Sequence, residues 1–406
     1  MKTGWEVAEL STVCDVFTDG NWIESKDQSL DGIRLIQTGN VGEGIFKDRR
    51  DKARFIDDAT FDRLKCFEVL PGDCLISRLP DPVGRACEIP ETGDKMITAV
   101  DCSVVRVNGN RLNRNYFIYY SQSRTYLRDV DDVCSGTTRR RISRKNLGKI
   151  KIPLPPLDEQ KRIVAVLDAA FDGLARARAR AEANLQNARE LFESVLDEEF
   201  GHENDAWHLK TIYDLCTIGD GNHSSKYPKK SEMVAKGVPF LRATNIRNGE
   251  VDKTKMLYIS EKKHRDLKKG HLRGGDILFT NRGEIGKVAI VPNDLDGANL
   301  NSQVAWLRCS NLISNKFLFY QLQSRRMKAH FLSTKSGAAL QQFTIKMLKN
   351  LRISIPDRSE QELIVIRIAT AEEKVSVLLI QYQQKLIDID DLRQSLLQKA
   401  FAGELT

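Results

Sequence analysis

Apolar residues recur at steps of three and four along two long stretches of this chain, residues 158–199 and 359–402. This spacing is typical of one face of an α-helix and not of a strand. The first stretch has no Pro and a single Gly, and about 42 residues in a helix extend roughly 63 Å. The two predicted seams consist of Ile163, Leu167, Ala170, Leu174, Ala177, Ala181, Ala188, Phe192 and Val195, and of Ile364, Ile368, Ala371, Val375, Leu378, Tyr382, Leu386, Ile389, Leu392 and Leu396.

Each predicted helix follows proline, which stops a strand and is tolerated where a helix begins. Pro155-Pro156 precedes the first and Pro356 the second, so Asp158 and Ser359 are the candidate N-caps. Two lone helices of this length would leave their seams in water. We therefore expect them to pack on each other, and the chain order makes the pair antiparallel.

The regions before the two helices are copies of one unit, related by about 200 residues. Such a period is far longer than that of a solenoid repeat, so the chain carries a duplicated unit of one globular domain and one helix. The matched segments are Asp19-Gly20-Asn21 and Asp220-Gly221-Asn222, Gly72-Asp73-Cys74-Leu75 and Gly275-Asp276-Ile277-Leu278, and residues 147–160 and 348–361.

Within each copy, short apolar and β-branched runs alternate with Gly, Asn and Asp turns, and a helical pattern follows at residues 114–123 and 316–328. The fold class is therefore α+β with a largely antiparallel sheet. The predicted result is two similar globular domains separated by an antiparallel coiled-coil spacer, an internal repeat with a pseudo-two-fold axis. The predicted domains are residues 1–155, the central helix 156–202, residues 203–356 and the C-terminal helix 357–406.

Charge is distributed unevenly along the 406 residues, although the net charge is only +8. Residues 203–356 hold 26 Lys and Arg against 13 Asp and Glu, whereas the two helical segments together hold 12 against 19. Basic globular domains favour a polyanionic partner, and acidic helices do not. Two basic domains on a stiff spacer would suit the roughly 34 Å repeat of DNA.

Motifs for catalysis or for metal binding are missing from the sequence. It has no GxxxxGK[ST] loop, no HExxH and no CxxC pair among its eight Cys. Asp276 with Glu284 and Lys287 comes closest to a nuclease centre, but the spacing between the last two is ExxK. We therefore nominate no catalytic residue, no metal ligand and no cofactor for this chain.

Basic and amide side chains gather instead in loops at corresponding places of the two copies. Arg can bind guanine through a fork of hydrogen bonds, Asn and Gln can bind adenine, and both Lys and Arg neutralise phosphates. Taken singly, such a residue is more often a solvated surface charge, and it is the recurrence of the sets at matched positions that favours binding. The repeat places Leu340-Gln341-Gln342 where the first copy has Arg139-Arg140-Arg141. Because the two domains differ at these loops, we expect them to read different sequences. The candidates are Lys47, Arg49, Arg50, Arg78, Arg139, Arg140, Arg141, Arg144, Asn222, His223, Lys226, Arg242, Lys262, Lys263, Asn281, Arg282, Gln341 and Gln342.

The sequence resembles the specificity subunit of type I restriction-modification systems over essentially its whole length. The resemblance lies in the duplication, the Gly-Asp-x-Leu turns, residues 152–160 (IPLPPLDEQ) with their echo 353–361 (ISIPDRSEQ), and the ending 400–405 (AFAGEL). One departure is Asp357-Arg358-Ser359 where the first copy has Pro156-Leu157-Asp158, which affects how the second helix begins.

The resemblance implies that each globular domain is a target recognition domain for half of a bipartite, asymmetric double-stranded DNA sequence. The helices would set the spacer and dock two adenine-N6 methyltransferase subunits, which restriction and translocase subunits would join. S-adenosylmethionine, ATP and Mg²⁺ would belong to those partners. Cleavage and methylation would then be the work of the assembled complex.

Two other functions remain open at this point. The chain could be an autonomous DNA-modifying or cleaving enzyme with an unrecognised site, or an adaptor that spaces two protein-binding domains without nucleic acid. The sequence has no run of about 18 apolar residues, and its start (MKTGWEVAEL) lacks the apolar core of a signal peptide. We therefore expect a cytoplasmic protein without a membrane partner.

Overall fold

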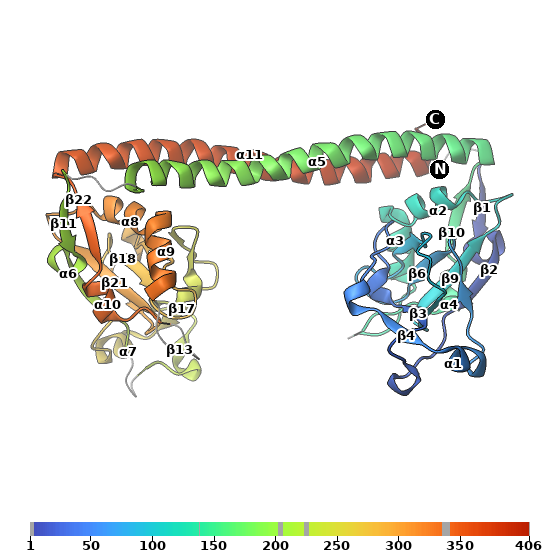
Figure 1. The fold of residues 1–406 in the computed structure, drawn as a ribbon, viewed down its shortest axis with the longest axis horizontal. Helices are drawn as coiled ribbons and strands as arrows, with labels where there is room; N and C mark the ends of the chain where they lie inside the picture. Colours follow the sequence, from blue (N-terminus) through green and yellow to red (C-terminus); the bar gives the residue numbers. More distant parts are fainter. Residues whose placement is uncertain (1–3, 138, 202–205, 223–226, 335–341, 406) are drawn as a thin grey trace. The chain divides into compact units, whose positions relative to one another are not determined.

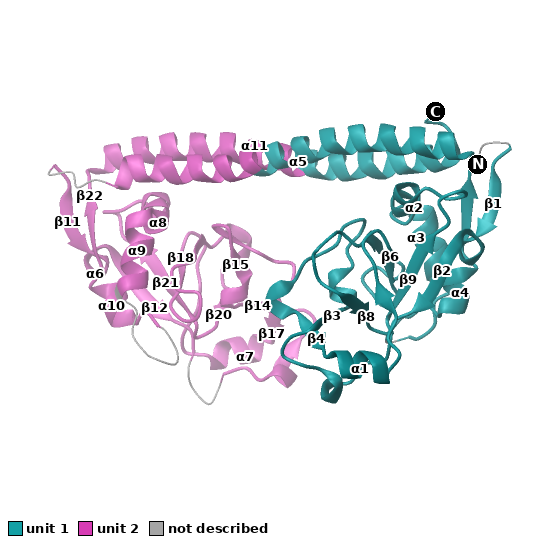
Figure 2. Cartoon of the chain, turned by 45° about the vertical axis from the view of Figure 1, so that its right-hand side comes forward, with its two compact units in different colours: residues 1–182, 384–406 teal, residues 183–383 magenta. Residues whose placement is uncertain are grey.

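The computed structural model describes residues 4–137, 139–201, 206–222, 227–334 and 342–405 (Figure 1). The chain forms two compact units, residues 1–182 with 384–406 (unit 1) and residues 183–383 (unit 2) (Figure 2). Each unit contains one globular head and part of each of two long helices. The units divide both helices in their middle, whereas the boundaries predicted from sequence follow the ends of the helices.

The long helices are α5 (Leu157–Phe200) and α11 (Arg358–Ala402). Within unit 1 they run antiparallel. The Arg393 guanidinium of α11 lies 4.4 Å from the centre of the Phe171 ring of α5. Further along α5, Arg178 pairs with Asp390, which comes earlier in α11.

Within unit 2 the other halves of α5 and α11 pack together and against head 2. Arg367 of α11 donates two hydrogen bonds of 2.7 Å to the Glu199 carboxylate near the end of α5. Leu196 and Phe200 of α5 share one apolar core with Ile364 and Ile368 of α11.

Most predicted seam residues are shielded from solvent, and two are exposed. Ala177 and Leu392 face solvent, because a helix of 3.6 residues per turn drifts away from a 3.5-residue repeat. Leu397, which the seam omitted, is fully buried because the end of α11 also packs on head 1. Among the other predicted positions, the buried ones are Ile163, Leu167, Ala181, Ala188, Ile364, Ile368, Val375 and Ile389, and the half-buried ones are Ala170, Leu174, Phe192, Val195, Ala371, Leu378, Tyr382, Leu386 and Leu396.

The N-caps differ from those predicted. Helix α11 begins one residue before Ser359, and the Asp357 carboxylate accepts from the Glu360 N–H at 2.9 Å while the Ser359 hydroxyl donates to Asp357. Helix α5 begins at Leu157, so Asp158 lies in its first turn. Asp357 thus takes the capping role, since its carboxylate reaches the free N–H of the third helical residue.

Head 1 contains two four-stranded sheets, ordered β2-β9-β6-β7 and β4-β3-β8-β5, and the antiparallel pair β1-β10. The pair β3-β8 is parallel and the other strand pairs of this head are antiparallel. The strands are β1 (Glu6–Glu9), β2 (Cys14–Asp19), β3 (Ile33–Ile36), β4 (Arg54–Ile56), β5 (Glu68–Val69), β6 (Cys74–Ser77), β7 (Ala86–Glu88), β8 (Met96–Thr98), β9 (Cys102–Val107) and β10 (Lys151–Leu154).

Head 2 repeats this topology with sheets β12-β21-β18-β19 and β13-β17-β14-β20, the pair β11-β22 and a small hairpin β15-β16. Its one parallel pair among the described strands is β14-β20. The strands are β11 (His208–Thr211), β12 (Cys216–Asp220), β13 (Met233–Val234), β14 (Val238–Leu241), β15 (Ile246–Arg247), β16 (Glu250–Val251), β17 (Leu257–Ile259), β18 (Ile277–Thr280), β19 (Val288–Ile290), β20 (Asn299–Leu300), β21 (Val304–Cys309) and β22 (Arg352–Ile355).

The structure has two helices where the sequence predicted one over residues 316–328, because Ser324 interrupts the helix. The Ser324 hydroxyl donates to the Gln321 carbonyl and accepts from the Met327 N–H, and Ser123 caps the corresponding helix of head 1. None of the helices in the described part of the chain has the length and apolar character that crossing a bilayer requires. The short helices are α1 (Asp58–Arg63), α2 (Arg114–Tyr120), α3 (Arg124–Asp132), α4 (Arg144–Gly148), α6 (Ile212–Leu215), α7 (Glu261–Asp266), α8 (Asn315–Gln323), α9 (Arg325–Thr334) and α10 (Ile345–Lys349).

Candidate nucleic-acid interface

In head 1, the segment that follows β6 joins three other segments. Arg78 donates its backbone N–H to the Asp101 carbonyl oxygen at 2.9 Å, and its own carbonyl accepts from the Ile142 N–H at 3.3 Å. Its guanidinium donates to the Val100 carbonyl and lies 3.3 Å from the carboxylate of Asp19 at the end of β2. Loops that are far apart in the sequence therefore meet at Arg78.

Two further arginines, whose side chains are more exposed than that of Arg78, belong to this group of residues. Arg141 pairs with Asp101 at 3.0 Å, and Arg144 Nε lies 3.9 Å from Asp19. The Arg78 side chain is only 6% exposed, whereas that of Arg141 is 42% exposed. Burial lowers the pKa of the Arg78 guanidinium, and the Asp19 carboxylate opposes that shift. Arg78 thus holds the loops, and Arg141 and Arg144 face outward.

Head 2 has the same backbone arrangement with different side chains. Asn281, the first residue after β18, donates its N–H to the Gln303 carbonyl at 3.1 Å and accepts from the Phe343 N–H at 2.9 Å. We call Arg78, Asp101 and Arg141 of head 1 strand-end set 1. The corresponding places in head 2 are occupied by Asn281, Gln303 and Gln342, which we call strand-end set 2.

The two sets offer different chemistry at one position of the fold. Set 1 is made of charged groups, and set 2 of amides that can both donate and accept. The Oδ1 atom of Asn281 is buried and has no hydrogen-bond partner among the described residues. A buried amide oxygen without a partner is costly, so this atom has unused bonding capacity at the strand end.

The framework under these sets is common to both heads. Asp73 accepts two hydrogen bonds from Arg106 at 2.8 and 2.9 Å, and Asp276 accepts two from Arg308 at 2.8 and 2.7 Å. Both carboxylates are 1% exposed. The Gly-Asp turns seen in the sequence are therefore anchored by ion pairs, and both oxygens of Asp276 are engaged by Arg308. Within the described residues, no group of three or more His, Cys, Asp and Glu is placed to hold a metal.

A matched pair of glutamines fastens each long helix to its own head. The Gln160 amide accepts from the Asn113 N–H at 2.7 Å and donates to two carbonyls, and Gln361 does the same with the Ser314 N–H at 2.9 Å. Both glutamines are buried. The Glu-Gln repeat was visible in the sequence, but its structural role was not recognised there.

The other candidates of head 1 are exposed and differ in their partners. Arg50 pairs with Asp48 and Asp94, and Arg140 pairs with Asp131 at 2.9 Å. Lys47, Arg49 and Arg139 are exposed. These cations can supply charge to a phosphate backbone, but they come from separate loops.

The candidates of head 2 divide between the interior and the surface. Asn222 is buried and donates to the Lys269 carbonyl at 3.1 Å, and Arg242 donates to the Lys255 carbonyl at 3.1 Å. Lys262 is exposed, Arg282 is half-buried, and Lys263 pairs with Glu232 at 2.9 Å. The candidates His223, Lys226 and Gln341 lie outside the described residues.

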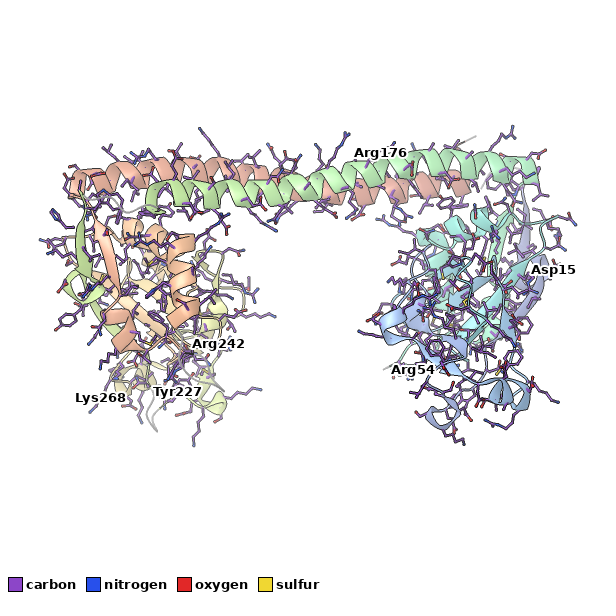
Figure 3. The ribbon with its side chains drawn as sticks, viewed as in Figure 1. Asp15, Arg54, Arg176, Tyr227, Arg242 and Lys268 are labelled. Carbon is purple, nitrogen blue, oxygen red and sulfur yellow. The ribbon has the colours of Figure 1, made fainter. Side chains whose placement is uncertain are left out.

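Sequence reasoning missed several polar residues of both heads. Asp101 and Gln303 were not candidates, although the repeat could have aligned them. The exposed cations Arg54 and Lys268 belong to basic clusters of the sequence but were not among the candidates, and Figure 3 places each at the end of its head that is remote from the long helices. Arg54 follows the candidate cluster directly, so its position in the sequence was a usable signal.

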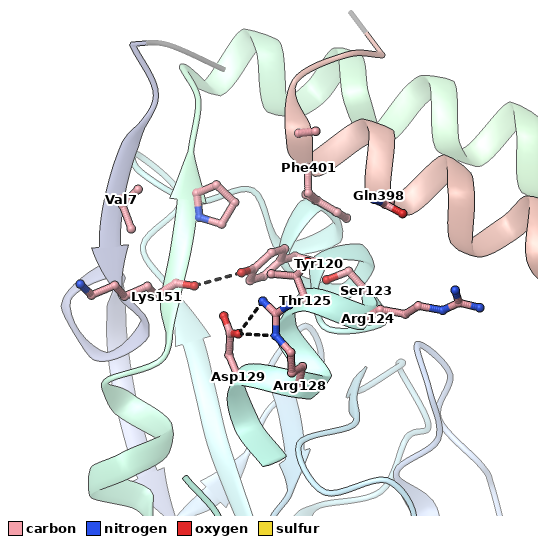
Figure 4. A pocket seen from close by; sticks show the side chains of 12 residues that line it. Val7, Tyr120, Ser123, Arg124, Thr125, Arg128, Asp129, Lys151, Gln398 and Phe401 are labelled. Carbon is pink, nitrogen blue, oxygen red and sulfur yellow. Dashed lines mark hydrogen bonds and ion pairs between the residues drawn. The ribbon is translucent and has the colours of Figure 1, made fainter. Parts of the chain in front are cut away.

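A cavity of about 760 Å³ lies in unit 1 where the head meets the end of α11 (Figure 4). The Tyr120 ring packs edge-on against Phe401 with centroids 5.0 Å apart, and its hydroxyl donates to the Lys151 carbonyl at 3.0 Å. Exposed Arg124 and Arg128 line the same cavity. It is a junction between head and helix, and no acid–base pair in it suggests catalysis.

Comparisons with known proteins agree with this division into two similar halves. A family model described as "Type I restriction modification DNA specificity domain" matches residues 2–183 and 204–382. The chain is 28% identical to the type I restriction enzyme EcoBI specificity subunit of Escherichia coli, over 74% of this chain and 68% of that protein. It is 24% identical to the EcoKI specificity subunit of E. coli, over 100% of this chain and 90% of that protein.

Solved structures share the fold at lower identity. A chain from a study of complex assembly and conformational transition of the type I R-M system superposes with a TM-score of 0.81 at 20% identity, covering 100% of this chain and 99% of that one. The HsdS subunit from Thermoanaerobacter tengcongensis gives a TM-score of 0.58 at 19% identity, covering 100% and 98%.

Proposed function

The chain belongs to the type I restriction-modification DNA specificity family, and from that premise we propose that its two heads read the two halves of a bipartite, asymmetric DNA target. Members of this family are non-catalytic DNA-recognition subunits of a restriction-modification complex. The observation that carries the proposal is the pair of heads with one framework and different side chains at the strand ends. Because both heads have the same framework, they place their strand-end loops in the same way. Because the side chains on those loops differ, the two heads would recognise different half-sites.

The charges of the heads support a DNA partner. Residues 203–356, which comprise head 2, carry 26 Lys and Arg against 13 Asp and Glu. Cations that contact phosphates release counterions and give affinity without sequence preference, while side chains at base edges give the preference. In head 1 the exposed Lys47, Arg49 and Arg139 fit the first role. Arg78 and Asn222 are buried, so their proposed part is to hold loops in place.

We assign the spacer length to the long helices. Helix α5 has 44 residues and α11 has 45, both are continuous, and the Gln160 and Gln361 amides fasten each to a head. A helix fastened at its start transmits a fixed rise of about 1.5 Å per residue. The number of residues between the heads would then fix the number of unread base pairs between the half-sites.

The partners of the proposed complex are two adenine-N6 methyltransferase subunits, with restriction and translocase subunits added to that core. In unit 2, helix α11 leaves Leu363, Ile366, Val377 and Ile380 exposed. A stripe of exposed apolar residues on a helix is a usual protein-binding surface. S-adenosylmethionine, ATP and Mg²⁺ are assigned to the partners, and because host DNA is the substrate, we place the complex in the cytoplasm.

The experiment that tests the function is methylation mapping. The chain is expressed with its methyltransferase subunit in a host that lacks adenine methylation, and N6-methyladenine is located by genome sequencing. We expect one motif made of two short specific halves with a fixed gap, and no methylation from either protein alone. Methyl transfer by the isolated chain, or a continuous motif, would contradict the proposal.

The two competing functions fit the structure less well. An autonomous enzyme built on Asp276 is not favoured, because Arg308 occupies both oxygens of that buried carboxylate. A protein-spacing adaptor would bind duplex DNA weakly and with little dependence on salt. Several phosphate contacts would instead make the affinity of the complex fall steeply between about 50 and 200 mM salt.

A further inference from the structure

One half-buried residue stands at the same structural position of both heads and differs in chemistry between them. We propose that Arg141 in head 1 and Gln342 in head 2 are the base-selecting residues at this position, with Arg141 binding a guanine and Gln342 an adenine. The inference rests on the proposed function and adds the residue and the base to it. Its strongest support is that strand-end sets 1 and 2 share a backbone arrangement.

The equivalence of the two positions follows from hydrogen bonds and not from residue identity. In head 1 the carbonyl of Arg78, directly after β6, accepts a hydrogen bond from the N–H of Ile142, the residue after Arg141. In head 2 the carbonyl of Asn281, directly after β18, accepts one from the N–H of Phe343, the residue after Gln342. A capped short helix follows in both heads, with Ser143 and Thr344 as N-caps. Arg141 and Gln342 therefore leave the same turn.

Arg141 is prepared for a fork of hydrogen bonds in head 1. Its guanidinium is held 3.0 Å from the Asp101 carboxylate, and 42% of the side chain remains exposed. The carboxylate occupies one side of the planar group and reduces the freedom lost on binding. A guanidinium with a free edge is the group that pairs with O6 and N7 of guanine, and lysine cannot reproduce this planar fork.

Gln342 offers an amide at this place in head 2. An amide can accept from N6 and donate to N7 of adenine at the same time. Its neighbours in set 2 are amides too, and the buried Asn281 Oδ1 lacks a hydrogen-bond partner within the part of the chain that the structure describes. Arg282, which bridges to Gln342 through the backbone, is half-buried and supplies a cation beside the amides.

Two neighbouring arginines differ from Arg141 in their contacts or burial. Arg140 is held by the carbonyl and the carboxylate of Asp131. Arg78 is buried and bonded inward. Arg140 is thus the control for Arg141, because it has the same side chain in the same segment but its guanidinium is bound to Asp131, outside strand-end set 1.

The test uses the chain in complex with its methyltransferase subunit and maps the methylated motif. For Arg141→Gln we expect the guanine preference at one position of one half-site to fall about tenfold, with the other half-site and the gap unchanged. For Gln342→Arg we expect a change in the other half-site alone, from adenine toward guanine. Arg140→Gln, which removes a candidate phosphate contact, should leave the base preferences of both half-sites as they are even where it lowers the overall level of methylation.

The possible results separate the inference from the proposed function. If the wild-type complex gives no bipartite motif, the proposed function fails. If the wild type gives a bipartite motif and Arg141→Gln leaves it unchanged, the inference is overturned while the function stands. If Arg141→Gln abolishes methylation, Arg141→Lys decides: it keeps the charge but not the fork, so retention of full guanine preference would also overturn the inference.

Discussion

At the scale of single residues, the buried Asp–Arg pairs explain the Gly-Asp turns that the sequence repeats. Asp276 accepts from Arg308 and also from the Arg273 N–H at 2.8 Å, so one carboxylate closes a turn and joins two strands. Asp73 does the same with Arg106 and the Leu70 N–H. This shared Asp–Arg pair is therefore structural, and we propose that the reading chemistry lies where the heads differ.

Asp276→Asn should lower the free energy of unfolding of head 2 by about 2 kcal/mol, because it leaves the Arg308 guanidinium, which is 28% exposed, without its counter-charge. Hydrogen exchange of head 2 amides during mild denaturation measures this loss. Glu284→Gln, an exposed acid in the same head, is the control and should change little. Loss of methylation by the complex without loss of stability would argue instead for a chemical role of Asp276.

We expect a histidine pair to contribute to the pH dependence of the stability of head 2. The rings of His264 and His271 lie with centroids 4.5 Å apart. Burial lowers the pKa of His264 below its usual 6.5, and the charge of His271 lowers it further. The unfolded state then binds the proton more readily, so the stability that neutral His264 contributes is fully present above about pH 6.5 and is lost as the pH falls through the lower folded pKa.

His264→Gln should reduce this loss of stability between about pH 7 and pH 5. Hydrogen exchange of head 2 amides at both values is the measurement, and His208→Gln, at an exposed position, is the control. An unchanged difference between the two pH values in His264→Gln would show that other groups dominate. Glu261 and Arg265 also act on His264, in opposite directions, so both belong in the comparison.

At the scale of elements, the apolar pattern was sufficient for the long helices and much less so for the heads. Helices α5 and α11 follow from their spacing alone, but Asp357 and not Ser359 caps the second. The parallel pairs β3-β8 and β14-β20 could not be predicted, because they join strands separated by about sixty residues that include several other strands and a helix. The break at Ser324 required its hydroxyl bonds, which compete with a continuous helix.

The candidate site was recoverable from the sequence only in part, for a related reason. The repeat aligned Arg141 with Gln342 and so located the loop that differs between heads. It could not indicate that Arg78 is buried and bonded to Asp19 and Val100, because that depends on how four loops meet at a strand end. Partner acids such as Asp101 were missed because a search for DNA-binding residues favours cations.

At the scale of the whole molecule, the proposed ruler makes a quantitative prediction. Four residues are inserted into α5 after Ala183 and four into α11 after Gln383, so that both strands of the coiled coil lengthen together. Four helical residues add about 6 Å, which corresponds to about two base pairs of 3.4 Å each. We expect the methylated motif to keep both half-sites, and the gap between them to lengthen by one or two base pairs.

Length must be distinguished from disturbance of the helices in this experiment. Arg176→Ala and Gln186→Ala, both at exposed positions on α5, change the helix surface without lengthening it and should leave the gap unchanged. Inserting four residues into α5 alone should weaken methylation, because the paired seams fall out of register on one side of the insertion. A changed half-site with an unchanged gap would contradict the ruler, since the heads, with their Gln160 and Gln361 fastenings, are untouched by these insertions.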